Sequence, residues 1–330
     1  MNFLLNINIL SKTIILIIVC SLVACEKDKP ISKVNDAYCP ACDSCANFIK
    51  DTLGGIPRDA FELFNEQKAP CYNPLDANEF VFIKEQDSSR KSSLVKYNMF
   101  THKETNLLEN IIINGQPKWG NNGWITFINN YQICIIKADG SGFKRLTSFP
   151  YFQFPDWKND SIIACLFTKN LSYPNYYGEL NIVSGKLDTL RNKYFNLGVM
   201  NKLNEKAYTQ YKGEPNITIE KKDTTIKLSN IEYDGKNEIV SISWHNNDQD
   251  IYFSKVVNGI YKINKNSYVE SLIKKGCNSR SYNLLSVSPD GKKIIVERVD
   301  ATLENIKLIY FKSDIYIMDI DGRNEEKVFK

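Results

Sequence analysis

Short apolar runs separated by turn residues recur along this chain, and the last stretch, residues 285–330, is the clearest copy. It contains an apolar run, a Pro-Asp-Gly turn, two alternating runs, an Asp-Gly turn and a closing apolar run. Residues 314–321 alternate apolar and polar side chains, which is typical of a half-buried β-strand. Asp321 and Gly322 supply the positive φ that a tight hairpin needs. The stretch therefore predicts four antiparallel strands in one unit.

The same unit recurs earlier in the chain, and each copy begins at one anchor residue. The anchors are about 38 to 47 residues apart, at Tyr72, Trp119, Trp157, a position near Leu197, Trp244 and Val287. This period is that of a four-stranded propeller blade. A β-sandwich has no reason to repeat one anchor and strand order six times, and a β-helix turn is far shorter. We therefore predict an all-β fold, a six-bladed β-propeller over residues 72–330, whose fourth unit (residues 196–228) is the most degenerate.

Residues 1–24 have the pattern of a targeting segment. Lys12 is the only charged residue among them, and the apolar run at 13–19 is too short to span a bilayer as a mature helix. The sequence Leu-Val-Ala-Cys that ends at Cys25 resembles the lipobox of bacterial lipoproteins. That resemblance implies cleavage before Cys25 and acylation of its thiol. The alternative is an ordinary secretory signal followed by a chance cysteine.

Acylation of Cys25 would place the protein in the bacterial cell envelope. Several acyl chains on one residue give near-permanent anchoring, because each buried methylene contributes about 0.8 kcal/mol. Residues 25–37 are polar and unpatterned, as expected of a lipidated flexible tether. We expect attachment to the outer membrane, on its periplasmic face or at the cell surface, with the membrane as a partner through Cys25.

Residues 38–71 form a Cys-rich segment that contains Cys39, Cys42, Cys45 and Cys71. In a reducing compartment three closely spaced thiols would suggest zinc or an iron–sulfur centre. An exported location favours pairing instead, and no histidine follows as covalent haem attachment would require. We therefore predict two disulfides among these four cysteines, with three connectivities open. A redox role for the closely spaced pair is the less favoured alternative.

The composition fits a globular β-rich protein and argues against a nucleic-acid partner. Apolar residues make up 43% of the chain, charged residues 24% and aromatic residues 12%. The formal net charge of +4 is small for 330 residues, so the overall balance implies no basic face for nucleic acid.

Few residues offer catalytic or metal-binding chemistry. His102 and His245 are the only histidines; His102 is expected in solvent, and a structural role is favoured for His245 although a place in the channel lining is conceivable. No G-x-S-x-G stretch is present. Tight hairpins, rather than calcium loops, explain the four Asp-Gly pairs, which start at Asp139, Asp234, Asp290 and Asp321. We therefore expect no cofactor and no metal site.

Other side chains are expected to serve packing. We predict that Trp119, Trp157 and Trp244 pack between adjacent blades, and that Cys134 and Cys165 act as small apolar residues in strands. Seven cysteines follow Cys25, so at least one of their thiols is unpaired.

The repeated unit resembles the WD40-like repeats of the TolB family. In that family a blade reads roughly W-S-P-D-G, an apolar strand, D-I-Y-x-M-D-x-D-G and R-L-T; the match is close over residues 285–330 and recognisable over residues 135–147. The resemblance implies a propeller that binds proteins or small ligands at its central channel. We therefore expect a lipid-anchored, non-catalytic module that binds an envelope protein or small ligand. The alternative is an envelope hydrolase or lyase that acts on glycan in the central channel.

Overall fold

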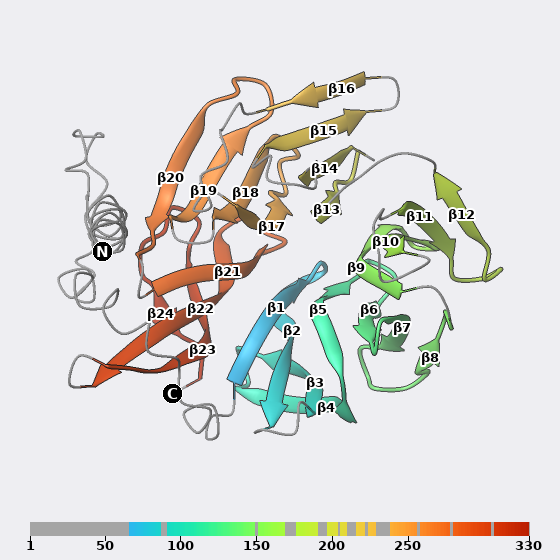
Figure 1. The fold of residues 1–330 in the computed structure, drawn as a ribbon, viewed down its shortest axis with the longest axis horizontal. Coiled ribbons are helices and arrows are strands. Elements are labelled where there is room, and N and C mark those ends of the chain that lie inside the picture. Colours follow the sequence, from blue (N-terminus) through green and yellow to red (C-terminus); the bar gives the residue numbers. More distant parts are fainter. Residues whose placement is uncertain are drawn as a thin grey trace, which may run out of the picture.

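The computed structural model of the chain describes residues 66–86, 91–148, 151–168, 176–190, 197–203, 205–209, 216–221, 224–228, 238–255, 258–277, 280–304 and 307–329. The predicted signal peptide, the tether and most of the Cys-rich segment lie outside these ranges. The described elements are all β-strands, grouped into six four-stranded antiparallel sheets in chain order. The sheets surround a common centre, with the first strand of each innermost and the fourth outermost (Figure 1). The predicted six-bladed β-propeller is confirmed.

The first three blades follow one another around the ring. Blade 1 contains β1 (Glu66–Asn73), β2 (Asp76–Gln86), β3 (Lys91–Asn98) and β4 (Lys103–Ile111). Blade 2 contains β5 (Ile113–Trp119), β6 (Trp124–Asn129), β7 (Gln132–Lys137) and β8 (Lys144–Arg145). Blade 3 contains β9 (Tyr151–Asn159), β10 (Ile162–Thr168), β11 (Tyr176–Asn181) and β12 (Leu187–Leu190).

The remaining three blades complete the ring. Blade 4 contains β13 (Leu197–Met200), β14 (Lys206–Thr209), β15 (Ile217–Lys221) and β16 (Thr224–Lys227). Blade 5 contains β17 (Ile239–Trp244), β18 (Asp250–Lys255), β19 (Gly259–Asn264) and β20 (Glu270–Lys275). Blade 6 contains β21 (Arg280–Val287), β22 (Lys293–Glu304), β23 (Lys307–Asp319) and β24 (Glu326–Lys327). The predicted blade start at residue 72 therefore lies inside β1.

The core lies between the blades. Six clusters of buried apolar side chains are found, and each joins two neighbouring sheets. Within blade 1 the consecutive residues Phe80, Val81, Phe82 and Ile83 are all buried. The half-buried pattern expected of blade strands is therefore incomplete, because the central strands of a blade are covered on both faces by neighbouring blades.

The innermost strands of the first three blades share a proline next to a β-bulge. Pro70, Pro117 and Pro155 each lie two residues before the anchor of their blade, where the register of the innermost strand shifts. Proline cannot donate a ladder hydrogen bond, so in a paired strand it is confined to such irregular positions. The bulge locally bends the innermost strand just before the anchor.

Asp-Gly turns close the hairpins as predicted. Gly140, Gly291 and Gly322 all have positive φ. The carboxylate of the preceding aspartate accepts the backbone N–H two residues ahead, from Ser141, Lys292 and Arg323 respectively. Asp234 lies outside the described residues.

The ring closes between blade 6 and blade 1 without a shared strand among the described elements. Phe80 and Phe82 of blade 1 pack against Ile295 and Ile315 of blade 6. Side chains of blade 6 also bond to the backbone of β1, since Glu297 Oε2 accepts the Ala69 N–H at 2.9 Å. Side-chain packing and hydrogen bonds therefore hold this seam.

Candidate functional site

The carboxyl ends of the six innermost strands surround a cavity of about 520 Å³. One anchor from each blade lines it, namely Tyr72, Trp119, Trp157, Met200, Trp244 and Val287. All six innermost strands therefore run toward the same end of the channel, which we call the channel mouth. The turns after the first and third strands of each blade lie on this face, because neighbouring strands are antiparallel.

The residue before each anchor also lines the cavity, and we call these six residues the channel ring: Cys71, Lys118, Asp156, Val199, Ser243 and Ser286. Two tryptophans show that the positions are equivalent. Trp157 Nε1 donates to the carbonyl of Lys118 at 3.1 Å, and Trp244 Nε1 donates to the carbonyl of Val199 at 3.3 Å. Each indole thus bonds to the preceding blade, so the predicted packing of these tryptophans between blades is confirmed.

Ring side chains connect neighbouring blades through a repeated hydrogen bond. At three junctions a ring oxygen accepts the backbone N–H of the next blade's anchor: Met200 to Asp156 Oδ2 (3.2 Å), Val287 to Ser243 Oγ (3.1 Å) and Tyr72 to Ser286 Oγ (3.2 Å). The thiol of Cys71 donates to the Tyr72 carbonyl at 3.6 Å, and the backbone of Trp119 is close enough to lower the pKa of this thiol. Most polar ring atoms are therefore committed to holding the blades together.

Lys118 departs from this pattern because an ammonium cannot accept a hydrogen bond. At its junction the N–H of Trp157 bonds instead to Asp156 Oδ1 at 3.0 Å. The half-buried Lys118 lines the cavity, and its Nζ donates to Gln116 Oε1 at 2.7 Å. Lys118 thus has no side-chain atom that could accept the backbone N–H of the next blade's anchor.

Asp156 sits between two lysines but is held in a low-dielectric place. Burial raises its pKa, while Lys118, the backbone N–H groups of Met200 and Trp157, and Lys206 act in the opposite direction. Both carboxylate oxygens point at the junction, where they accept backbone N–H groups. The carboxyl group therefore has a structural role at the wall of the cavity.

Gln116 connects three blades two residues before Lys118. Its Nε2 donates to the carbonyl of Pro70 at 2.5 Å and to the carbonyl of Leu285 at 3.3 Å. The side chain is buried, so blade 2 is tied to blades 1 and 6 below the channel ring.

His245 lines the cavity, as was conceivable from the sequence, and it is fully engaged within turns. Its Nε2 lies 3.1 Å from the carbonyl of Gly291, and its Nδ1 accepts the N–H of Asn247 at 3.2 Å. These partners correspond to a neutral imidazole that donates from Nε2. His102 is exposed in the β3–β4 turn, with Nδ1 3.1 Å from the Tyr97 hydroxyl.

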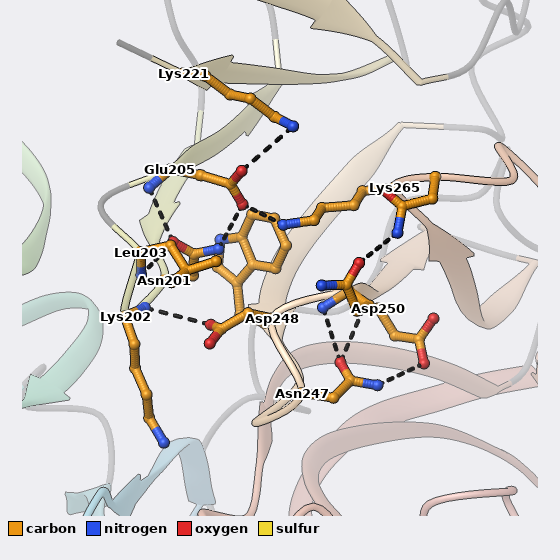
Figure 2. Close-up of polar contacts among 12 residues, drawn as sticks. Asn201, Lys202, Leu203, Glu205, Lys221, Asn247, Asp248, Asp250 and Lys265 are labelled. Carbon is orange, nitrogen blue, oxygen red and sulfur yellow. Dashed lines mark hydrogen bonds and ion pairs between the residues drawn. The ribbon is translucent and has the colours of Figure 1, made fainter.

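A polar network fixes the wall of the mouth between blades 4 and 5 (Figure 2). Glu205 accepts hydrogen bonds from Asn201 Nδ2 at 2.8 Å and Lys265 Nζ at 2.5 Å, and Lys221 Nζ lies 3.4 Å away. The backbone N–H of Lys202 donates to Asp248 at 3.3 Å. The β13–β14 turn, which carries Lys202 to the cavity, is therefore tied to blade 5.

Exposed apolar side chains gather on the mouth face. Seven of the nine large ones among the described residues lie in turns of this face, namely Leu75, Phe100, Phe143, Val183, Leu203, Tyr268 and Val269. Val183 is 84% exposed, Phe100 82% and Leu75 71%. Ile112 and Tyr131 lie in connections at the opposite end. Leu75 and Leu203 directly follow the cavity-lining residues Pro74 and Lys202, and we call these two exposed side chains the apolar rim.

One of the predicted site cysteines lies among the described residues, and the other four lie outside them. Cys25, Cys39, Cys42 and Cys45 lie outside the described residues, so acylation and disulfide pairing stay predictions. Cys71 belongs to the channel ring, where burial raises the pKa of its thiol. The four described cysteines, Cys71, Cys134, Cys165 and Cys277, are buried and form no disulfide with one another. Cys134 and Cys165 lie in strands, as predicted.

Sequence reasoning missed the channel ring, although a signal for half of it was present. The triplets 70–72, 117–119 and 155–157 all read proline, polar residue, aromatic anchor. The middle residues are Cys71, Lys118 and Asp156, which meet around the cavity. Side chains alternate between the two faces of a strand, so when the anchor packs between blades, the residue before it points toward the channel. In the part of the chain that the structure describes, no three His, Cys, Asp or Glu side chains are grouped as metal ligands, and no helix could span a membrane.

No protein-family model matches this chain, and no curated protein sequence matches it. Solved structures with a similar fold do exist. TolB from Acinetobacter baumannii is 15% identical with a TM-score of 0.55, and the match covers 85% of this chain and 66% of that chain.

Two oligogalacturonate lyase structures are also similar. The enzyme from Vibrio parahaemolyticus is 11% identical with a TM-score of 0.51, over 81% of this chain and 77% of that chain. An oligogalacturonate lyase in complex with manganese is 9% identical with a TM-score of 0.54, over 80% of this chain and 77% of that chain. At these identities the likeness extends to the fold alone. This protein therefore shares the propeller fold of TolB and of lyases.

Proposed function

We propose that this protein is a non-catalytic binding module of the bacterial cell envelope, lipid-anchored through Cys25, and that a protein partner docks on its mouth face. Exposed apolar side chains in the described turns of the mouth face carry the proposal. Leu75, Phe100 and Leu203 are each more than half exposed, and they lie in turns of the mouth face. Exposed apolar side chains on one face favour association with a protein partner.

The direction of β1 is compatible with an anchored protein whose mouth is accessible. β1 begins at Glu66 and ends at Asn73, next to Pro74 in the cavity lining. Glu66 therefore lies at the end of the channel opposite the mouth. The first described residue of the propeller therefore lies on the face opposite the proposed docking face.

A glycan hydrolase or lyase with its site in the central channel is the alternative function. Oligogalacturonate lyases are among the proteins of similar fold. Two features of the mouth support binding instead: the carboxylate of Asp156 accepts two backbone N–H groups, and both ring nitrogens of His245 have turn partners. Cleavage of an oligogalacturonate by the purified protein would favour the enzyme.

Site-specific photocrosslinking in intact cells tests the proposed docking face. A photoreactive amino acid replaces Leu75, Val183 or Leu203, which are 71%, 84% and 59% exposed on the mouth face. We expect each of the three positions to give an adduct of the same discrete mass, because one partner would contact several turns. Immunoblotting of the membrane fraction reads out the adducts.

Ile112 and Tyr131, exposed at the opposite end, are the matched control positions and should give no such adduct. Adducts from both faces alike, or from the control face only, would contradict docking at the mouth. Cys25→Ser serves as the control for the anchor, because loss of acylation should move the protein to the soluble fraction. Unchanged membrane association of this variant would contradict the lipid anchor.

A further inference from the structure

We propose that Lys118 binds a side-chain carboxylate of an acidic, apolar-flanked peptide segment of the partner, inserted into the channel mouth. This inference rests on the proposed function and names the chemistry that the cavity recognises. It is carried by the position of Lys118 in the channel ring and by the apolar rim.

Lys118 does not accept a backbone N–H of the next blade, as Ser243 and Ser286 do. Ser243 and Ser286 each accept the N–H of the next anchor, whereas at the Lys118 junction Asp156 takes that N–H. In the described part of the chain, Gln116 is the hydrogen-bond acceptor of the Lys118 ammonium, which acts on the nearby Asp156 electrostatically without a direct ion pair. An ammonium has three donors, so two are left to face the cavity.

A carboxylate is the group that would satisfy these donors best. A half-buried ammonium loses hydration, and a charge-assisted hydrogen bond to an anion compensates that loss more fully than a neutral acceptor does. Ser243 lies on the same ring, and its Oγ already accepts the Val287 N–H, so its own proton can be donated to a ligand. The carboxylate oxygens of Asp156 are directed at backbone N–H groups of the junction.

The surroundings favour a peptide over an acidic sugar as the carrier of that carboxylate. A cavity of about 520 Å³ admits a short segment of an extended chain. Leu75 and Leu203 on the rim would contact apolar side chains next to the acidic residue. The indoles of Trp157 and Trp244 are packed into blade junctions, which reduces the ring surface available for stacking on a sugar.

Titration calorimetry on the full-length protein in detergent micelles tests this inference. The probes are two capped hexapeptides, one of alternating leucine and glutamate and one of alternating leucine and glutamine. We expect the glutamate peptide to bind about tenfold more tightly, the effect of one charge-assisted hydrogen bond. Lys118→Met should remove this preference, and Lys118→Arg should restore it.

Two further variants serve as controls. Lys158→Met removes a cavity-lining lysine that is already paired with Glu179 at 2.8 Å, so the preference should persist. Asp156→Asn keeps an oxygen for the Met200 N–H and removes a nearby negative charge, so the preference should increase. Melting curves of all variants verify that the propeller remains folded.

Equal affinity for both peptides, a preference that survives Lys118→Met, or no peptide binding would overturn the inference. Lys118-dependent binding of trigalacturonate without peptide binding would assign the site to acidic glycan and would overturn it as well. Mouth-face photocrosslinks without a glutamate preference would leave the proposed function standing while this inference fails. Loss of the crosslinks would contradict the proposed function itself.

Discussion

Cys71 occupies the ring position that serine occupies in blades 5 and 6. The Trp119 backbone acts on the Cys71 thiol, at the junction where Ser243 and Ser286 accept the N–H of the anchors that follow them in their own blades. Burial raises the pKa of the Cys71 thiol, so the neutral thiol is the stable form in this position. The same residue was predicted from the sequence to form a disulfide, so the ring adds a second role for it.

Substitution of this residue distinguishes the two roles. In Cys71→Ser the hydroxyl would accept the Trp119 N–H as Ser243 and Ser286 do for their junctions. We expect the free energy of unfolding to stay within about 1 kcal/mol of wild type, because both partners of the hydrogen bond are kept. Chemical denaturation with and without reductant measures it. A loss of several kcal/mol confined to oxidising conditions would instead support the predicted disulfide.

At the scale of an element, the β13–β14 turn shows how the most degenerate blade is held. The anchor of this blade is Met200 rather than tryptophan, and among the described residues the cluster between blades 3 and 4 contains four buried side chains. The buried pair of Glu205 and Lys265 ties this turn to blade 5, where Lys265 also lies 5.7 Å from the ring centroid of Trp244. Polar bonds thus add to the buried apolar cluster that joins blades 4 and 5.

Lys265→Met should therefore destabilise the propeller on the order of 3 kcal/mol, because it leaves the buried Glu205 without its closest cation. Lys221→Met is the matched control, since Lys221 is more exposed and lies 3.4 Å from the same carboxylate. Its loss should cost less than about 1 kcal/mol. Equal effects of the two substitutions in urea denaturation would contradict the special role of Lys265.

The difference in stability between wild type and Lys265→Met depends on pH through the pKa of Glu205. Burial opposes ionisation, but hydrogen bonds from Lys265 and Asn201 outweigh it and hold the pKa below 4.5. A lowered folded-state pKa contributes stability that is complete above the unfolded value and is lost as the pH falls through the folded value. The difference in the free energy of unfolding between wild type and Lys265→Met should therefore decrease as the pH falls below about 4.5.

At the scale of the whole molecule, the seam between blades 6 and 1 closes the ring. Phe329 after the last strand packs on Phe82, with ring centroids 5.0 Å apart, and on Tyr97 at 4.8 Å. Glu297 accepts the N–H of Ala69, which has positive φ, and Ser313 Oγ donates to the Gln67 carbonyl at 3.3 Å. Contacts from residues far apart in the chain thus replace the shared strand that the described sheets lack.

Glu297 makes the stability of this seam dependent on pH. Burial raises the pKa of this carboxyl group, and the Ala69 N–H, Asn283 and Lys68 only partly oppose the effect. A raised folded-state pKa gives a stabilising contribution that is complete below the unfolded value and is lost as the pH rises through the folded value. Glu297→Gln keeps an acceptor for Ala69 without a titratable charge.

We expect the melting temperature of Glu297→Gln to rise relative to wild type between about pH 4 and pH 8, because only wild type must ionise a buried carboxyl group. Calorimetry across this range measures the difference. Glu297→Ala serves as the control for the hydrogen bond and should be about 1 to 3 kcal/mol less stable than Glu297→Gln at every pH. Parallel pH profiles of wild type and Glu297→Gln would show that ionisation of Glu297 does not cause the pH dependence of stability.

The sequence by itself determined the blades of this protein, because their order depends on local chemistry. Asp-Gly pairs, alternating runs and anchors such as Trp119 and Trp244 act within a few residues of one another, and together they predict six repeated sheets. The same local reasoning placed the turn at Asp321 and assigned the tryptophans to blade junctions.

Tertiary structure alone decided the site. Lys118, Asp156 and Ser243 are separated by whole blades in the chain, and only closure of the ring brings them around one cavity. Whether a ring side chain joins two blades or faces a ligand depends on the N–H group that the next blade presents to it. That partner is set by the packing of neighbouring sheets, and no local pattern along the chain specifies it.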